Sequence, residues 1–214
     1  MRIHTLSIGV PETRTDARGQ WQSAIHRQPI AGPVLLTASG HAGDQVADRK
    51  HHGSPDQAVC AQPQAHYAFW NAEYDTDIFG PAVLGENWTL EDADEASVYV
   101  GDIYCVGDAV VQMSAPRIPC SKQERKVGLR GFLRRVRKHR RTGWYLRVLE
   151  PGEVAAGDEL VLLSRPERAY TIAQVNESWH GKLDPAFIEE LMRAPELAEG
   201  WKEMLRWRLA QAVR

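Results

Sequence analysis

The chain has 214 residues, enough for one β-rich domain of about 150 to 200 residues with a small appendage. Its 26 Lys and Arg nearly balance its 28 Asp and Glu, so the formal charge of −2 gives no overall attraction to nucleic acid or to an anionic membrane. No stretch reaches the roughly 18 apolar residues of a membrane helix, and the N-terminus has too short an apolar run for a signal peptide, so we expect a cytoplasmic protein without membrane association. The three cysteines contain no C-x-x-C pair, which disfavours a disulfide framework and a structural zinc site.

Up to about residue 164 the sequence favours strands. Short apolar runs broken by Gly, Pro and Asp occur at Pro33 to Thr37, Ser97 to Val100, Ile103 to Val106, Ala109 to Met113 and Glu159 to Leu163. These runs predict a mainly β fold, a barrel or a sandwich. Two helices are expected to interrupt it: one over 63–70, with an aromatic face against the barrel, and one over 129–137 inside the basic run 122–141.

Beyond Arg165-Pro166 the pattern changes to helix only. We expect helices over 172–179, over 186–192 after an Asp184-Pro185 cap, and over 196–209. The sequence therefore divides into a β domain, residues 1–164, and a three-helix tail, residues 166–214. Trp179, Trp201 and Trp207 are the expected anchors of this tail on the barrel or on a second subunit, which would make the protein a homodimer.

The segment Lys50 to Asp56 concentrates polar chemistry in a loop, where rigid scaffolds often display functional groups. Lys50 and His52 could bind an anion, or histidine and aspartate could bind a metal, although their spacing matches no common zinc pattern. A solvated polar loop is the alternative.

Cys120 stands at the end of an apolar strand, in the segment Ala115-Pro-Arg-Ile-Pro-Cys-Ser-Lys122. Two prolines stiffen this loop, and Arg117 and Lys122 favour the thiolate, the form that binds a soft metal or attacks an electrophile. An inert buried thiol is the alternative, and it is the expected state of Cys60 and Cys105.

Two further segments carry groups suited to a ligand. Arg27 could form a bidentate contact with a phosphate, or could be a surface arginine. Gly85-Glu86-Asn87 offers an unusual backbone with an acceptor and a donor for a heterocycle, or is a tight turn that starts a strand.

In their order along the chain, these segments resemble the MOSC-domain proteins. The residues that carry the resemblance are Arg27-Gln-Pro-Ile30, Gly43-Asp-Gln-Val-Ala-Asp48, Lys50-His-His-Gly-Ser-Pro-Asp-Gln-Ala-Val59, Gly85-Glu-Asn87, Gly101-Asp102 and Pro116-Arg-Ile-Pro-Cys120. The resemblance is greatest to the YiiM-like group, the hydroxylaminopurine-resistance proteins, whose members also carry a three-helix tail after the barrel.

The resemblance implies a MOSC-type β-barrel that holds molybdenum on a pterin dithiolene (molybdopterin), with Cys120 as the protein's ligand to the metal. It also implies reduction of small N-hydroxylated compounds, such as hydroxylaminopurine, to the amine, with electrons from a separate flavin or haem protein. The residues that would bind the cofactor are Arg27, Asp44, Lys50, His52, Gly85, Glu86, Asn87, Arg117 and Lys122. Cleaving an N–O bond needs a proton, which a histidine titrating near neutrality or a water on the metal could deliver. Cys120 and His52 are the catalytic candidates. Asp44 and Asp56 are expected to orient His52 or nearby amides.

At two positions the sequence departs from the family pattern. Ser54 stands where a second glycine is common and would be strained if the backbone there had a positive φ. Ser121 replaces the usual aromatic residue and is expected to open the mouth of the pocket.

Two other functions fit parts of the sequence. A cofactor or sulfur carrier without turnover would use the same Cys120. A nucleic-acid surface would use the basic run 122–141 with Trp144 and Tyr145, although the negative net charge disfavours it.

Overall fold

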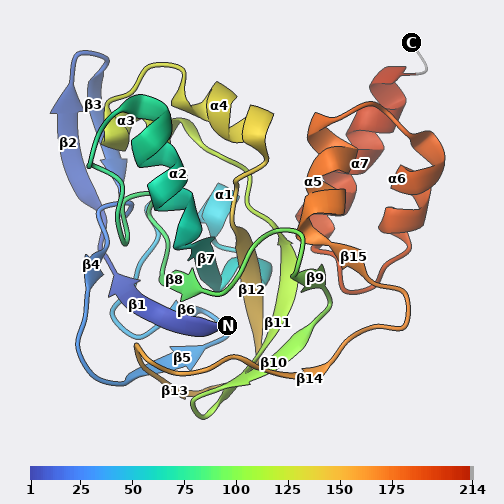
Figure 1. Cartoon of the computed structure of the whole chain (residues 1–214), viewed down its shortest axis with the longest axis horizontal. Helices are drawn as coiled ribbons and strands as arrows, with labels where there is room; N and C mark the ends of the chain where they lie inside the picture. The colour runs from blue at the N-terminus through green and yellow to red at the C-terminus, as the bar shows by residue number, and fades with distance from the viewer. Residues whose placement is uncertain (213–214) are drawn as a thin grey trace.

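An eight-stranded sheet forms the centre of the computed structural model, which describes residues 1–212 (Figure 1). All neighbouring strands are antiparallel except β7 and β8. In spatial order the strands are β14 (Val161–Ser164), β10 (Ile103–Val106), β11 (Ala109–Pro116), β12 (Trp144–Glu150), β7 (Val59–Pro63), β8 (Trp88–Glu91), β1 (Arg2–Ile8) and β4 (Gln28–Pro29).

The sheet curls into a half-barrel because the start of β1 meets the segment before β14. Arg2 forms an isolated antiparallel bridge with Glu159, and the Ile3 amide donates to the carbonyl of Asp158 at 2.9 Å. These bonds pair backbone groups that an open sheet would leave free at its edge. The mainly β, barrel-like fold expected from the strand pattern is confirmed.

Three smaller sheets complete the β structure. β5 (Val34–Thr37) pairs with β13 (Gly152–Val154) and β6 (Gly40–His41). β9 (Tyr99–Val100) pairs with β15 (Tyr170–Thr171), and β2 (Glu12–Asp16) forms a hairpin with β3 (Gly19–Ser23).

Four helices and a 3-10 turn accompany the barrel: α1 (Arg49–His52), η1 (Pro55–Gln57), α2 (Ala65–Tyr74), α3 (Ser121–Val127) and α4 (Phe132–His139). α2 and α4 share a second small core, in which Trp70 and Phe132 are fully buried. The aromatic face of α2 packs on α4 and on the segment 79–84, and its Tyr67 hydroxyl also lies 3.1 Å from Oγ1 of Thr89 in β8, so the barrel is only part of the surface that it covers. The basic run 122–141 contains two helices where the sequence predicted one.

The tail consists of α5 (Ile172–His180), α6 (Pro185–Met192) and α7 (Glu199–Ala212), beside the barrel in Figure 1. Asp184 caps α6 with Pro185 in its first turn, as predicted. Apolar residues of all three helices join the core of the barrel. Trp201 is buried there and Trp179 packs against the same core, but Trp207 is 59% exposed and does not anchor the tail on the barrel. Its role against a second subunit stays a prediction. The division at residues 164 and 166 stays a prediction, and positions 213 and 214 of the predicted tail lie outside the described residues.

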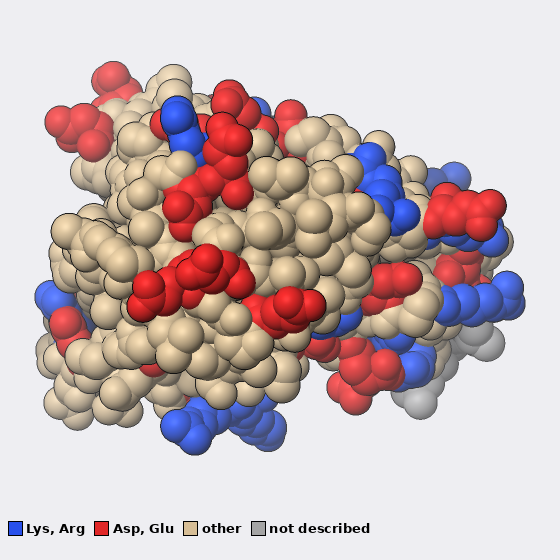
Figure 2. Space-filling view, turned by 90° about the horizontal axis from the view of Figure 1, so that it is seen from below, with Lys and Arg blue, Asp and Glu red and all other residues tan. Residues whose placement is uncertain are grey.

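The surface charge is unevenly distributed. Seen from below, in Figure 2, acidic side chains are scattered over a mostly uncharged end of the barrel, and Lys and Arg lie mainly at the margins and over the tail. Among residues 1–212 no helix has the length and apolar character needed to cross a membrane.

Candidate functional site

A cavity of about 380 Å³ lies among the loops around α1, the turn before β8 and the segment between β11 and α3. This volume falls in the range of small-molecule and cofactor sites. Most of the candidate residues from distant parts of the sequence line it together: Arg27, Asp44, His52, Gly85, Asn87, Arg117, Cys120 and Lys122.

Cys120 lies between the end of β11 and the start of α3, and its thiol is free and half-buried. Its extended backbone, with φ −107° and ψ 158°, places it just outside the first turn of α3. Cys60 lines the same cavity, and burial raises the pKa of Cys60, so this second thiol stays protonated at neutral pH. Cys60 is buried as expected. Cys105 is only half-buried, which corrects the prediction for that residue.

Arg117 is a buried cation on the cavity wall, with 6% of its surface exposed. Its Nη2 donates to the carbonyl of Leu84 at 2.8 Å, whereas its Nη1 is buried with no hydrogen-bond partner. Burial lowers the pKa of Arg117, but the ionisable groups around it raise it more, so the guanidinium stays charged. A buried, charged donor without a partner is costly, so the cavity is suited to an anion that would accept from Nη1.

Arg27, by contrast, already has its partners. Its Nε and Nη2 donate to Asp44 at 3.0 and 2.8 Å, and its Nη1 donates to the carbonyl of Gly85 at 2.6 Å. Asp44 also accepts from the amide of Gly9 at 2.8 Å. The bidentate contact that the sequence suggested for a phosphate is therefore occupied by Asp44, and the pair fixes one wall of the cavity.

Asn87 and Gly85 shape the same wall. The Asn87 Nδ2 donates to Asp44 at 3.0 Å, and the Asn87 Oδ1 accepts from the amide of Cys60 at 3.1 Å. Gly85 has a φ of +79°, and a Cβ there would lie 2.3 Å from a carbon of the Ile25 side chain, so only glycine fits. Asn87 therefore holds the backbone that carries Cys60.

The structure does not bring two of the predicted cofactor residues to the cavity. Glu86 is fully buried behind it, where it accepts from Tyr67 and from the amide of Ala82. Lys50 lies exposed on α1, outside the lining. Arg49, the residue before it and also exposed, lines the cavity instead. The sequence could not predict which of Arg49 and Lys50 lines the cavity, because a helix of four polar residues has no hydrophobic periodicity.

The other residues of the α1 loop have structural partners. His51 contacts Asp48 at 2.9 Å. Asp44 orients a nearby amide, that of Gly9, as expected, whereas Asp56 accepts from Arg147 at 2.8 Å instead of from His52 or an amide. Ser54 has a φ of −71° and caps η1, so it is not strained. No group of three or more His, Cys, Asp or Glu side chains in the described part of the chain could hold a metal ion.

Ser121 is the exposed first residue of α3 and does not line the cavity, and its expected effect on the width of the cavity mouth stays a prediction. Tyr145 does line it, a residue that the sequence pointed to only as part of a nucleic-acid surface. Trp144 is fully buried and Tyr145 nearly so, which leaves neither ring free to stack on bases. This removes the aromatic half of the nucleic-acid hypothesis.

His52 lines the cavity as a neutral side chain. Burial lowers its pKa to about 4, with a further contribution from the positive charge of Arg117. The sequence led us to expect a histidine titrating near neutrality, and in the ligand-free protein that expectation is not met. At pH 7 the ring offers one N–H donor and one acceptor nitrogen to the cavity.

The lowered pKa of His52 predicts a loss of stability in mild acid. Because the folded-state pKa of about 4 lies below the unfolded value of 6.5, the unfolded chain binds a proton first as the pH falls. The free energy of unfolding should therefore fall between pH 6.5 and 4. Replacing His52 by Asn should reduce that fall by about 1–2 kcal/mol, allowing for the partial exposure of the side chain.

Urea unfolding of both proteins at pH 7.5 and at pH 4.5 measures this effect. His41→Asn is the matched control for position in the fold, because burial also lowers the pKa of His41 to about 4 and this residue lies outside the cavity lining. It should reduce the fall in stability in the same direction. A variant with Asn at position 52 that loses as much stability as the wild type would show that His52 is not held neutral.

The fold and the cavity together define a barrel protein with a free cysteine beside a buried, unpaired cation. This is a donor set suited to a soft metal bound to an anionic carrier. The chain belongs to the MOSC-domain family, whose model matches residues 48–161, and residues 171–212 match the YiiM-like 3-alpha helix domain. MOSC domains are associated with binding of the molybdopterin cofactor.

Relatives support this membership over nearly the whole chain. The chain is 35% identical to the uncharacterized protein YflK of Bacillus subtilis over 94% of this chain and 90% of that protein. The crystal structure of YiiM from Geobacillus stearothermophilus is 32% identical, with a TM-score of 0.82 over 97% of this chain and 98% of that one. A protein of Gibberella moniliformis named reductase is 35% identical over 73% of this chain but only 28% of its own length.

Proposed function

We propose that this protein is a molybdenum-cofactor-dependent reductase of small N-hydroxylated compounds. The observation that carries the proposal is the meeting, in one cavity, of the free Cys120 thiol and the buried Arg117 whose Nη1 has no partner. The likeness to a fungal protein named reductase supports the class of reaction. The overall change is R–NHOH plus two electrons and two protons to R–NH2 plus water.

The residues of the cavity fit the cofactor. When bound, molybdopterin supplies the molybdenum centre at which the two electrons reach the N–O group. Cys120 would be the protein's sulfur ligand, and Arg117, Lys122 and Arg49 would bind the anionic part of the pterin. The ion pair between Arg27 and Asp44 would keep one wall of the cavity rigid. His52 could donate a hydrogen bond from its neutral ring to the leaving oxygen of the substrate.

Turnover tests the proposal and separates it from a carrier function. The protein, purified from a molybdenum-replete host, is analysed for molybdenum and then supplied with reduced methyl viologen and 6-hydroxylaminopurine. We expect the amine to form in proportion to bound molybdenum. Tight retention of the cofactor without any amine would identify a cofactor or sulfur carrier instead, and a protein without molybdenum would overturn both.

The electrons must come from another protein under this proposal, and α4 offers a surface for it. Four exposed cations, Arg130 in the turn before α4 and Arg134, Arg137 and Lys138 on α4 itself, form a surface that we call the basic face. Among residues 1–212 none of these four has an ion-pair partner. Three of these cations, Arg130, Arg134 and Arg137, line a shallow surface groove together with Glu124 of α3. α3 also supplies Lys122 to the cavity, so the groove and the cavity lie at the same helix. An acidic flavin or haem donor would be steered to this face.

Charge reversal at Arg134 and Arg137 should slow turnover with reduced flavodoxin, a small acidic flavoprotein, about tenfold at low ionic strength. Turnover with methyl viologen should not change, because that donor is small and cationic. The same reversal at Lys182 and Arg193 of the tail, both exposed and without an ion-pair partner among residues 1–212, is the matched control. Equal rates for both double variants would exclude docking at the basic face.

A further inference from the structure

Arg117 is braced from the side of the three-helix tail, although none of the described tail residues lines the cavity. α7 makes the first contact. The indole Nε1 of Trp201 donates to the carbonyl of Pro116, the residue before Arg117, at 2.8 Å. Three residues earlier, the amide of Ala198 donates to the carbonyl of Ser114 at 3.0 Å. The end of β11 is thus tied to α7 immediately before the chain enters the cavity wall.

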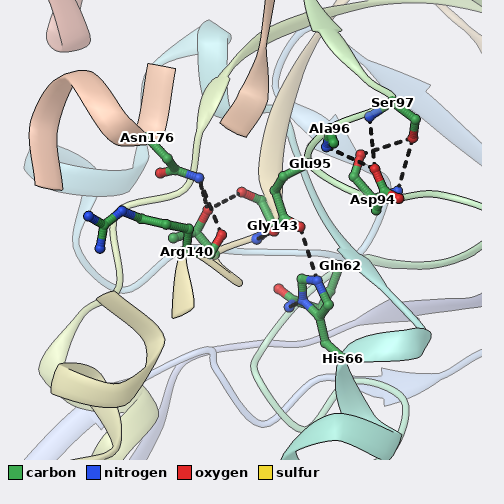
Figure 3. Close-up of polar contacts among 10 residues, drawn as sticks. Gln62, His66, Asp94, Glu95, Ala96, Ser97, Arg140, Gly143 and Asn176 are labelled. Carbon is green, nitrogen blue, oxygen red and sulfur yellow. Dashed lines mark hydrogen bonds and ion pairs between the residues drawn. The ribbon is translucent and has the colours of Figure 1, made fainter. Parts of the chain in front are cut away.

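A second set of bonds reaches Arg117 through Gly143. The Arg117 amide donates to the Gly143 carbonyl at 3.0 Å, and the Gly143 amide donates to Oε1 of the buried Glu95 at 2.9 Å. The other Glu95 side-chain oxygen lies 3.0 Å from Nε2 of His66 (Figure 3). The Glu95 carbonyl accepts from the amide of Ala173, in the first turn of α5, at 2.7 Å. α5 therefore fixes the backbone at Glu95, and the Glu95 side chain in turn fixes Gly143.

α5 also contacts the Gly143 segment from its own buried face. Asn176, with none of its surface exposed, donates from Nδ2 to Oγ1 of Thr142 at 2.8 Å. The Thr142 hydroxyl in turn donates to the Gly143 carbonyl at 2.9 Å, the same oxygen that accepts from Arg117. Figure 3 shows Asn176 and Glu95 on opposite sides of this segment.

Gly143 has no room for a side chain. Its φ is +68°, and a Cβ there would lie 2.3 Å from the carbonyl oxygen of Ala61 in β7. The backbone that accepts from the Arg117 amide is therefore packed directly against β7.

We propose that the tail is a brace for the anion-binding end of the cavity, with Trp201, Asn176 and Glu95 as positioning residues for Arg117. This inference rests on the proposed function in one respect, that Arg117 binds the anionic part of a ligand. The buried polar bonds of the tail hold the peptide group before Arg117 at both its carbonyl, through Trp201, and its amide, through Gly143, which apolar packing alone would not require. The position of the Nη1 donor is thereby set before any ligand arrives.

Trp201→Phe tests the brace, because it removes the indole N–H and keeps an aromatic ring. Hydrogen exchange of the full, metal-free chain should show the backbone amides of residues 114–120 exchanging about tenfold faster. Residues 103–110, in the β10–β11 hairpin, should be unchanged. Trp207→Phe makes the same chemical change at an exposed position of α7 and should alter neither segment. If Trp201→Phe fails to fold, Asn176→Leu tests the same proposal through α5.

The second readout is affinity for inorganic pyrophosphate, the probe for the anion site. Trp201→Phe should weaken binding about fivefold, and this effect should vanish in an Arg117→Met background, since coupled residues are not additive. Equal acceleration of both segments, or an unchanged affinity, would show that Trp201 only stabilises the fold and would overturn the brace. A wild-type protein that does not bind pyrophosphate would count against the proposed cofactor site, and the exchange of residues 114–120 would still decide whether the brace exists.

Discussion

Cys120→Ala is expected to remove at least nine-tenths of the molybdenum that the wild-type protein retains on purification, and the reductase activity with it. Among residues 1–212, Cys120 is the only half-buried thiol that lines the cavity, because the second thiol there, Cys60, is buried and its pKa is raised. Loss of a residue that merely supports a metal ligand already costs 10- to 100-fold in affinity, so loss of the ligand itself should cost at least as much. Elemental analysis and the amine assay measure the two effects.

Cys105→Ala is the matched control, because it removes a thiol that is half-buried and lies outside the cavity lining. It should retain the metal. Both variants should unfold at nearly the wild-type temperature, since neither thiol is fully buried. A Cys120→Ala protein that keeps its molybdenum and turns over normally would mean that the cavity does not bind the metal through this residue.

Arg117→Met is expected to weaken pyrophosphate binding about 30- to 100-fold without loss of stability. A charge-assisted hydrogen bond is worth about 1.5–3 kcal/mol, and Nη1 has no other partner to lose. Replacing a buried charge that is only partly satisfied by an apolar chain of similar length is often neutral or stabilising. Titration calorimetry of the metal-free protein gives the affinity, and thermal unfolding without ligand gives the stability.

The comparison with Arg27→Met separates the two cations. Arg27 is bound to Asp44, whose side chain is 8% exposed, so its removal leaves a buried carboxylate without its partner. That should cost about 3–5 kcal/mol and lower the unfolding temperature by about 10 °C. An Arg117 variant that binds pyrophosphate as tightly as the wild type, or an Arg27 variant as stable as the wild type, would reverse these assignments.

Much of the fold follows from local sequence pattern. The β10 strand, 103–106, was predicted at its observed bounds, and the cap at Asp184-Pro185 was correct. These features depend on alternation, apolar runs and capping residues within a few positions of each other. α3 was missed because a seven-residue helix of charged side chains carries no apolar period, and α1 because it has only four residues.

The sequence by itself determined which residues could do the chemistry: a free cysteine at a strand end, with Arg117 and Lys122 beside it and a family order that extends over nearly the whole chain. Only the tertiary structure decided what each of them does. Arg27 is paired because Asp44 folds against it, Arg117 is unpaired because it is buried where no acceptor reaches Nη1, and His52 is neutral because burial disfavours its charge. Burial and partners are set by segments far apart in the chain, and for that reason the order of residues alone could not reveal them.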